Sequence, residues 1–129
     1  MRLFLVRHAH SDAGEPDELR PLSARGREEA RALAERLAAE AAPSLVIASP
    51  LLRARETAAA IAKASGAELR VDDRLAPGAV ASDVLEAIEG ASGAVVTVGH
   101  QPDCSGIAFA LGAGPVDFPP AGLAEIELP

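Results

Sequence analysis

Three short apolar runs, each followed at once by polar residues, dominate the pattern along the chain. They lie at residues 3–6, 45–48 and 94–98, and continuous apolar runs of this length are typical of strands buried on both faces of a sheet. A weaker pattern predicts a short strand at residues 69–71 and a half-exposed strand at 123–128. The chain is therefore expected to contain a sheet whose central strands are fully covered.

Between these runs, apolar residues recur at helical spacing. Ser23 is expected to cap a helix that Pro43 ends, and a second helix is expected to end at Gly66. Ser49 and Pro50 are interpreted as the N-cap and the first residue of that second helix. Shorter helices are expected at residues 82–89 and from 102 to about 112.

Strands that alternate with helices in this way predict an α/β fold, a three-layer sandwich around a mostly parallel central sheet. The chain has 129 residues with neither an internal repeat nor a linker, and it is interpreted as one domain, residues 1–129. In such folds ligands bind beyond the carboxyl ends of the strands. The residues that directly follow the strands are therefore the first candidates for chemistry.

Composition narrows the classes of function and the compartment. Nineteen acidic and 12 basic residues give a net charge of −7, which argues against a general nucleic-acid binder that depends on phosphate contacts. Cys104 is the single cysteine, so no intramolecular disulfide can form, and no apolar stretch reaches the length of a membrane span. These features predict a cytoplasmic protein that binds neither nucleic acid nor membrane.

Cationic, imidazole and hydroxyl side chains follow the three strong strands. Arg7 and His8 follow the first, Ser49 follows the second with Arg53 one helical turn later, and His100 follows the third. Parallel strands would bring these residues to one edge of the sheet. Arginine pairs with phosphate in bidentate fashion, helix N-termini attract anions, and an imidazole can carry a phosphoryl group covalently. The residues alone therefore predict phosphoryl transfer with a histidine nucleophile.

The same residues resemble the motifs of the histidine phosphatase superfamily, whose fold is phosphoglycerate mutase-like. The three matching motifs are Arg7-His8-Ala9, Ser49 to Ala54 with Thr57 after it, and Gly99-His100-Gln101-Pro102. Within the superfamily, the short length and Arg20-Pro21-Leu22-Ser23 resemble the SixA-type phosphohistidine phosphatases. The resemblance runs from residue 1 to the C-terminal strand, in the family's order and spacing.

The resemblance implies a role for each matched residue. His8 would be the nucleophile that becomes phosphorylated, Arg7 and Arg53 would bind the phosphoryl oxygens, and His100 would stabilise the charge of the transferring group. Arg20 and Ser49 would contribute to substrate binding. Neither a metal nor another cofactor is required for this chemistry.

Two departures from the family's pattern affect the expected chemistry. Ala9 stands where glycine is usual, so a glycine-only backbone conformation there would require a slightly different loop. Many relatives use a carboxylic acid as general acid, but here Arg74 precedes residues 75–77, with Asp72 and Asp73 beside it, and no general acid is assigned. A phosphoramidate needs this acid least because its leaving nitrogen is readily protonated, which favours a P–N substrate.

Several polar residues also have a purely structural interpretation. Arg20 could pair with Asp17 or Glu18 nearby in the sequence. Cys104 is interpreted as a small buried residue of the last helix, since position 110 lacks the arginine that a cysteine phosphatase needs. The acidic pair at residues 28–29 is interpreted as solvated surface.

His10, His8 and His100 together raise the alternative of a three-histidine metal site. No carboxylate or thiolate supports such a site and arginines lie beside it, so no metal is expected. His10 is instead interpreted as a residue that lines the pocket or faces solvent.

We therefore expect a phosphatase that hydrolyses phosphohistidine on a protein through a phosphorylated His8. No lid insertion is evident, which would leave the mouth open to a protein substrate. One alternative is a small-molecule phosphomonoesterase or mutase that uses the same site on a phosphorylated metabolite. The other is a non-catalytic module that binds phosphorylated partners, although a pure binder has no need of the nucleophile.

Overall fold

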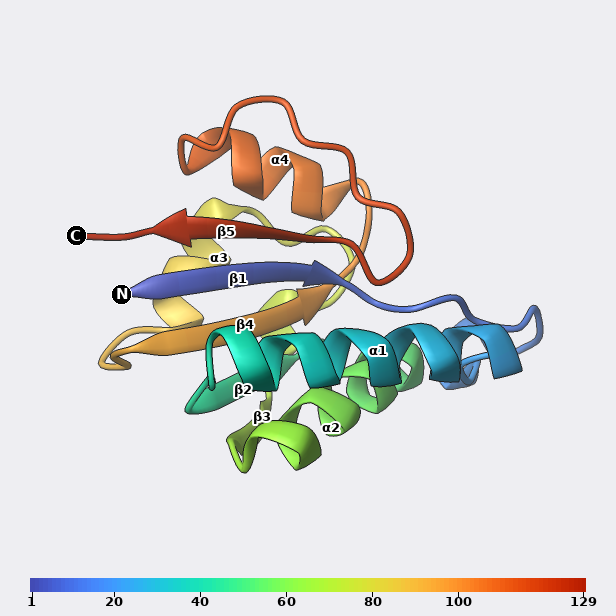
Figure 1. Cartoon of the computed structure of the whole chain (residues 1–129). Helices are drawn as coiled ribbons and strands as arrows, with labels where there is room; N and C mark the ends of the chain where they lie inside the picture. The colour runs from blue at the N-terminus through green and yellow to red at the C-terminus, as the bar shows by residue number, and fades with distance from the viewer.

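The computed structural model describes residues 1–129, and its centre is a five-stranded sheet in the order β3-β2-β4-β1-β5 (Figure 1). The strands are β1 (Arg2–Arg7), β2 (Leu45–Ala48), β3 (Glu68–Val71), β4 (Ala94–Gly99) and β5 (Leu123–Glu127). Strands β1 to β4 run parallel to one another. The outermost strand β5 pairs antiparallel with β1. The predicted mostly parallel sheet is confirmed, and its weakest predicted strand, β3, is the exposed outer strand.

Helices cover both faces of the sheet, as Figure 1 shows. On one face lie α1 (Ala24–Glu40) and α2 (Leu52–Ser65), and on the other lie α3 (Ala81–Ala87) and α4 (Asp103–Ala110). Two single 3₁₀ turns, η1 (Asp17–Leu19) and η2 (Asp73–Leu75), interrupt the connecting loops. The arrangement is the expected three-layer α/β sandwich. No helix combines the length and the apolar character that crossing a membrane requires.

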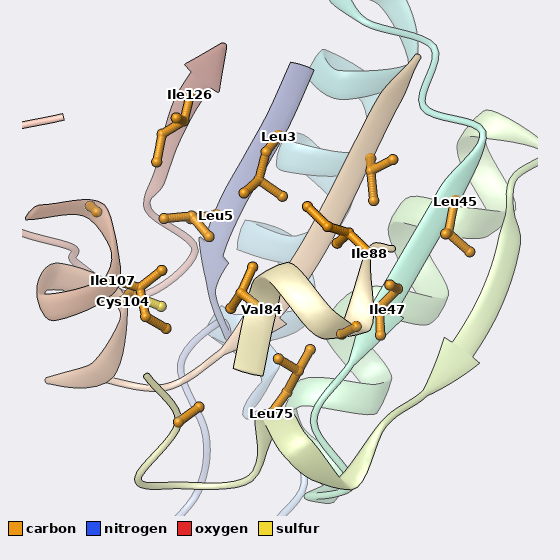
Figure 2. Close-up of a cluster of buried hydrophobic side chains, with 14 of the residues drawn as sticks. Leu3, Leu5, Leu45, Ile47, Leu75, Val84, Ile88, Cys104, Ile107 and Ile126 are labelled. Atoms are coloured by element: carbon orange, nitrogen blue, oxygen red, sulfur yellow. The ribbon is translucent and has the colours of Figure 1, made fainter. Parts of the chain in front are cut away.

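The core is divided by the sheet into two aliphatic clusters. Along β1, Leu3 and Leu5 point to the cluster that contains residues of α3 and α4 (Figure 2). Phe4 and Val6 point to the cluster under α1 and α2. Successive side chains of a strand point to opposite faces, so a continuous apolar run fills both clusters. The burial of all four residues explains why this strand has no polar position between Arg2 and Arg7.

Two predicted helix ends are confirmed, and one predicted start is wrong. The Ser23 hydroxyl accepts the Gly26 N–H at 3.0 Å at the start of α1, and Gly66 ends α2 in the left-handed conformation at φ 68°. Helix α2, however, begins at Leu52 rather than at Pro50, and no side chain caps it. Leu51, directly before the helix, is extended, and the Ser49 hydroxyl lies 2.7 Å from His100 Nε2 rather than capping α2.

The two ends of the chain lie side by side. The Met1 ammonium donates to the Leu128 carbonyl at 3.1 Å, and the Leu128 N–H donates back to the Met1 carbonyl at 2.8 Å. Because β1 and β5 are antiparallel, the N-terminus and the C-terminus of the chain lie on the same side of the sheet. This side is opposite the carboxyl ends of the parallel strands (Figure 1).

Candidate active site

The register of the sheet brings three strand ends level with one another. Val6 of β1 and Ala48 of β2 both pair with Val98 of β4. The residues that follow these positions therefore leave the sheet together at one edge. The structure thus brings together the side chains that the sequence places after the three buried strands.

An open cavity of about 410 Å³ lies at this edge, and most of the side chains that line it are charged or polar. Its wall is formed by Arg7, His8, His10, Ser11, Asp17, Arg20, Arg53, Pro77, His100, Gln101 and Pro120. Five of the six predicted site residues are in this wall. The sixth, Ser49, is fully buried behind His100.

The hydrogen bond of His8 fixes which of its ring nitrogens is free. Its Nδ1 lies 2.7 Å from the Ala9 carbonyl oxygen, and because a carbonyl only accepts, Nδ1 carries the proton and Nε2 keeps a lone pair. Burial, together with the nearby positive charges of Arg53 and Arg7, lowers the pKa of His8 to about 4. The ring is therefore neutral near pH 7.

The loop that carries His8 is supported from helix α2. The Ala9 N–H donates to the Thr57 hydroxyl at 3.1 Å, and that hydroxyl donates to the Arg53 carbonyl at 2.9 Å. Ala9 is fully buried and is not among the residues with positive φ. Alanine in place of the usual glycine therefore causes no backbone strain at this position.

His100 lies beside His8, with the two ring centroids 5.3 Å apart. Its Nε2 lies 2.7 Å from the Ser49 hydroxyl, and only 5% of the residue is exposed. Burial, followed by the effects of His8 and Arg53, lowers the pKa of His100 to about 4. Two neutral imidazoles therefore stand next to each other among arginines.

The arginines enter the cavity from three different elements. Arg7 ends β1 and donates from Nη1 to the Phe118 carbonyl at 2.9 Å. Arg53 lies in the first turn of α2 with 6% of its surface exposed, and its Nη1 donates to the Asp17 carbonyl at 2.9 Å. Arg20 follows η1 and donates to the Ser11 hydroxyl at 3.0 Å. Three guanidinium groups give this edge of an acidic protein a local positive charge.

Asp17 is the only carboxylate in the cavity wall. Its Oδ1 accepts from Arg20 Nε at 2.9 Å, and its Oδ2 accepts from Arg53 Nη2 at 3.3 Å. Arg20 pairs with Asp17, as the sequence allowed, and it also lines the cavity. The sequence shows Asp17 only as a neighbour of Arg20, because its other partner lies 36 positions away.

Three nitrogens on cavity residues are buried without a hydrogen-bond partner: Arg7 Nε, Arg53 Nε and His100 Nδ1. Buried polar groups are almost always paired, so a cluster of orphans requires an explanation. A tetrahedral oxyanion offers several acceptor oxygens to such groups and favours arginine as a partner. The cavity has the charge and the donors of a phosphate site.

His10 and Glu29 connect the cavity wall to helix α1. The His10 N–H donates to Glu29 Oε1 at 2.9 Å, and His10 Nδ1 lies 2.6 Å from the Ser23 hydroxyl. His10 lines the cavity, whereas the expectation that Glu29 is merely solvated surface is wrong. A Cβ on Gly26 would lie 1.8 Å from the His10 carbonyl oxygen, so only glycine permits this approach of helix and loop.

Cys104, Asp72 and Arg74 do not line the cavity. Cys104 is buried in α4, where burial raises the pKa of its thiol to about 12. Asp72 is paired with Arg74 at 2.7 Å, and neither residue lines the cavity. No group of three or more histidine, cysteine, aspartate or glutamate side chains is arranged to hold a metal ion.

Comparison with known proteins agrees with the fold and the motifs. Residues 3–77 match the model of the histidine phosphatase superfamily, branch 1, and the chain belongs to this superfamily. A search of curated proteins gave no match.

Among solved structures, the chain is similar to a protein assigned as the phosphohistidine phosphatase SixA of Agrobacterium tumefaciens. The two are 29% identical with a TM-score of 0.82, over 96% of this chain and 89% of the other. A protein histidine phosphatase SixA in complex with tungstate shares the fold at 23% identity and a TM-score of 0.87, over 99% and 88% of the two chains.

A mycobacterial glucosyl-3-phosphoglycerate phosphatase also shares the fold, at 24% identity and a TM-score of 0.72, over 96% and 90% of the two chains. These findings together support a phosphatase.

Proposed function

We propose that this chain is a phosphohistidine phosphatase that works through a phosphorylated His8. The observation that carries the proposal is the neutral His8 ring, with its Nε2 lone pair free, beside three arginines and three buried nitrogens without partners. A nucleophile and an oxyanion site in one cavity support catalysis rather than binding alone.

In the first step, His8 Nε2 attacks the phosphorus and the bond to the leaving group breaks. Arg7 and Arg53 bind the phosphoryl oxygens, whose negative charge they stabilise without a metal. His8 keeps the proton on Nδ1, held by the Ala9 carbonyl, so the phosphorylated ring is cationic. In the second step, water attacks the phosphorus, and neutral His8 leaves.

Ser49 orients His100 for this reaction. The Ser49 hydroxyl accepts the Leu51 N–H at 3.3 Å, which leaves its own proton to donate to His100 Nε2. The proton of the His100 ring then lies on Nδ1, the nitrogen without a partner. We infer that this N–H donates to an oxygen of the transferring phosphoryl group. Ser49 is accordingly a positioning residue rather than a direct ligand of the substrate.

Two observations favour a phosphohistidine substrate on a protein over a phosphate monoester. The cavity wall contains no carboxylic acid that could protonate an alkoxide, because its single carboxylate is ionised between two arginines. The cavity is open, and Asp17 at its mouth has 63% of its side chain exposed. The resemblance to the Agrobacterium protein assigned as a phosphohistidine phosphatase agrees with this choice.

The test is to trap the phosphoenzyme with a protein that carries ³²P-labelled phosphohistidine. The wild-type chain is expected to take up label in an acid-labile, base-stable form and to release phosphate, whereas His8→Ala should do neither. His10→Ala serves as the matched control, since it removes a histidine from the same cavity wall. Arg53→Lys should keep the charge but lose the planar fork, with turnover reduced about tenfold or more.

The substrate class is tested in the same assay series. Turnover of the phosphohistidine protein should exceed that of sugar phosphates and phosphoglycerates by orders of magnitude in kcat/KM. Efficient turnover of the small esters with none of the phosphohistidine protein would contradict the proposal. It would instead favour a metabolite phosphatase.

A further inference from the structure

We propose that Asp17 determines specificity by accepting a hydrogen bond from the distal ring N–H of the substrate's phosphohistidine. The inference rests on the proposed function and adds a residue for the leaving group. Its structural basis is that the one carboxylate of the cavity wall lies at the mouth, while the groups that would bind the phosphoryl oxygens lie on the floor.

Exposure distinguishes floor from mouth. The side chain of Arg53 is 7% exposed and His100 is 5% exposed, whereas 63% of the Asp17 side chain is exposed. A substrate on another protein enters from solvent, so its phosphoryl group reaches the floor and its imidazole remains at the mouth. Asp17 is the acidic group in the wall at that level.

The protonation state of the leaving imidazole decides how easily the P–N bond breaks. When the ring nitrogen that is not bonded to phosphorus carries a proton, the ring is cationic. His8 Nε2 then forms the new N–P bond, the old P–N electron pair returns to the substrate ring, and a neutral imidazole departs with its N–H intact. Without that proton the leaving group would be an imidazolate anion. The site therefore needs a hydrogen-bond acceptor, not a proton donor, for this substrate.

The same arrangement already exists on the enzyme's own histidine. His8 holds its Nδ1 proton against the Ala9 carbonyl at 2.7 Å, which prepares the phosphorylated ring to leave as neutral imidazole in the second step. Asp17 would do for the substrate ring what the Ala9 carbonyl does for His8. The two half-reactions would then be matched, each with an acceptor on the distal ring nitrogen.

The contacts of Asp17 suit an acceptor that stays charged. Arg20 binds Oδ1 and Arg53 binds Oδ2, and these contacts lower the pKa of the carboxyl group, so Asp17 remains an anion. Each carboxylate oxygen can accept more than one hydrogen bond, so both retain capacity for a substrate N–H. A phosphate ester offers no such N–H, and the negative charge that develops on its leaving oxygen would be repelled by Asp17.

The experiment compares Asp17→Asn with wild type on a phosphohistidine peptide and on p-nitrophenyl phosphate, an aryl ester whose leaving group needs no proton. For the peptide, kcat/KM should fall about tenfold or more, as expected for loss of a hydrogen bond to a charged group. For the ester it should rise about threefold, because a negative charge near the reacting group is removed. In the variant the cationic substrate ring is no longer stabilised by the Asp17 charge and loses its N–H proton at lower pH. The alkaline limb of the pH profile of kcat on the peptide should therefore also move to lower pH.

Glu18→Gln is the matched control. Glu18 is the next residue of the same turn, is exposed and makes no side-chain hydrogen bond or ion pair, so the substitution removes one negative charge outside the cavity wall. Both activities of this variant should equal those of wild type. Circular dichroism of each variant checks that the fold is unchanged.

The outcomes separate this inference from the proposed function. If Asp17→Asn lowers both activities equally, Asp17 only positions the arginines; if it raises both, Asp17 only competes with the bound anion. Either result overturns the inference while the phosphatase remains. If the wild-type chain cleaves the ester but not the phosphohistidine peptide, the proposed function fails and the inference fails with it.

Discussion

Acidification should destabilise this protein well before its carboxylates titrate, because two neutral histidines, the buried His100 and the half-buried His8, lie in the cavity wall. In the unfolded chain His8 and His100 titrate near the ordinary value of 6.5, whereas in the folded chain both have a pKa of about 4. Between these values the unfolded state binds more protons, so the free energy of unfolding falls as the pH drops through this window. The stabilisation is fully present above about pH 7 and is lost as the pH approaches 4.

The magnitude follows from the two pKa values. Moving from pH 7 to pH 5 costs about 2 kcal/mol for each histidine and about 4 kcal/mol for the pair. Most carboxyl groups remain ionised at pH 5 in both states, so this window isolates the histidines. Small domains are stable by only about 5–15 kcal/mol, which makes the expected change a large fraction of the total.

The assay is urea unfolding at pH 7 and pH 5, followed by circular dichroism, since the chain has neither tryptophan nor tyrosine for intrinsic fluorescence. In the double variant His8→Asn/His100→Asn the difference between the two pH values should shrink to below about 1 kcal/mol. His10→Asn controls for loss of a histidine from the same wall, because His8 and His100 both remain. A double variant that keeps the full wild-type difference would refute the reasoning.

Two further predictions concern the supports of the cavity. Gly26→Ala should lower the free energy of unfolding by about 1–3 kcal/mol, because the new Cβ collides with the His10 carbonyl. The matched control is Gly106→Ala in an open position of α4, which should leave the free energy of unfolding unchanged or raise it. Ser49→Ala should lower kcat about tenfold with little change in KM, because His100 loses the partner that sets its proton. An equal loss of stability in both glycine variants, or a Ser49→Ala effect confined to KM, would contradict these expectations.

The parts of the fold that sequence predicted are those fixed by neighbouring residues. The run 45–48 is buried on both faces because its side chains are apolar without interruption, and the Ser23 cap forms with a residue three positions away. Gly66 ends its helix because the left-handed conformation is inexpensive for glycine alone. Each of these features is contained within a few residues of chain.

The features that sequence did not predict depend on partners far along the chain. Ser49 has the residue type of an N-cap, but its hydroxyl is bound by His100, 51 positions away, and the helix starts later. Glu29 has the pattern of a solvated helix face, yet it accepts a backbone N–H 19 positions away. The pairing of Asp17 with Arg53 likewise forms only when η1 lies over α2. Local patterns predict elements, whereas these side-chain roles follow from the packing of one element on another.

The antiparallel pairing of β5 with β1 has a practical consequence for how the protein can be attached to something else. Both ends of the chain emerge together on the side of the molecule away from the cavity (Figure 1). An affinity tag, a fluorescent fusion or a surface tether at either end would therefore leave the mouth of the cavity facing away from the attachment. A short linker between the ends would close the chain into a ring, and new ends could then be opened in an exposed loop elsewhere.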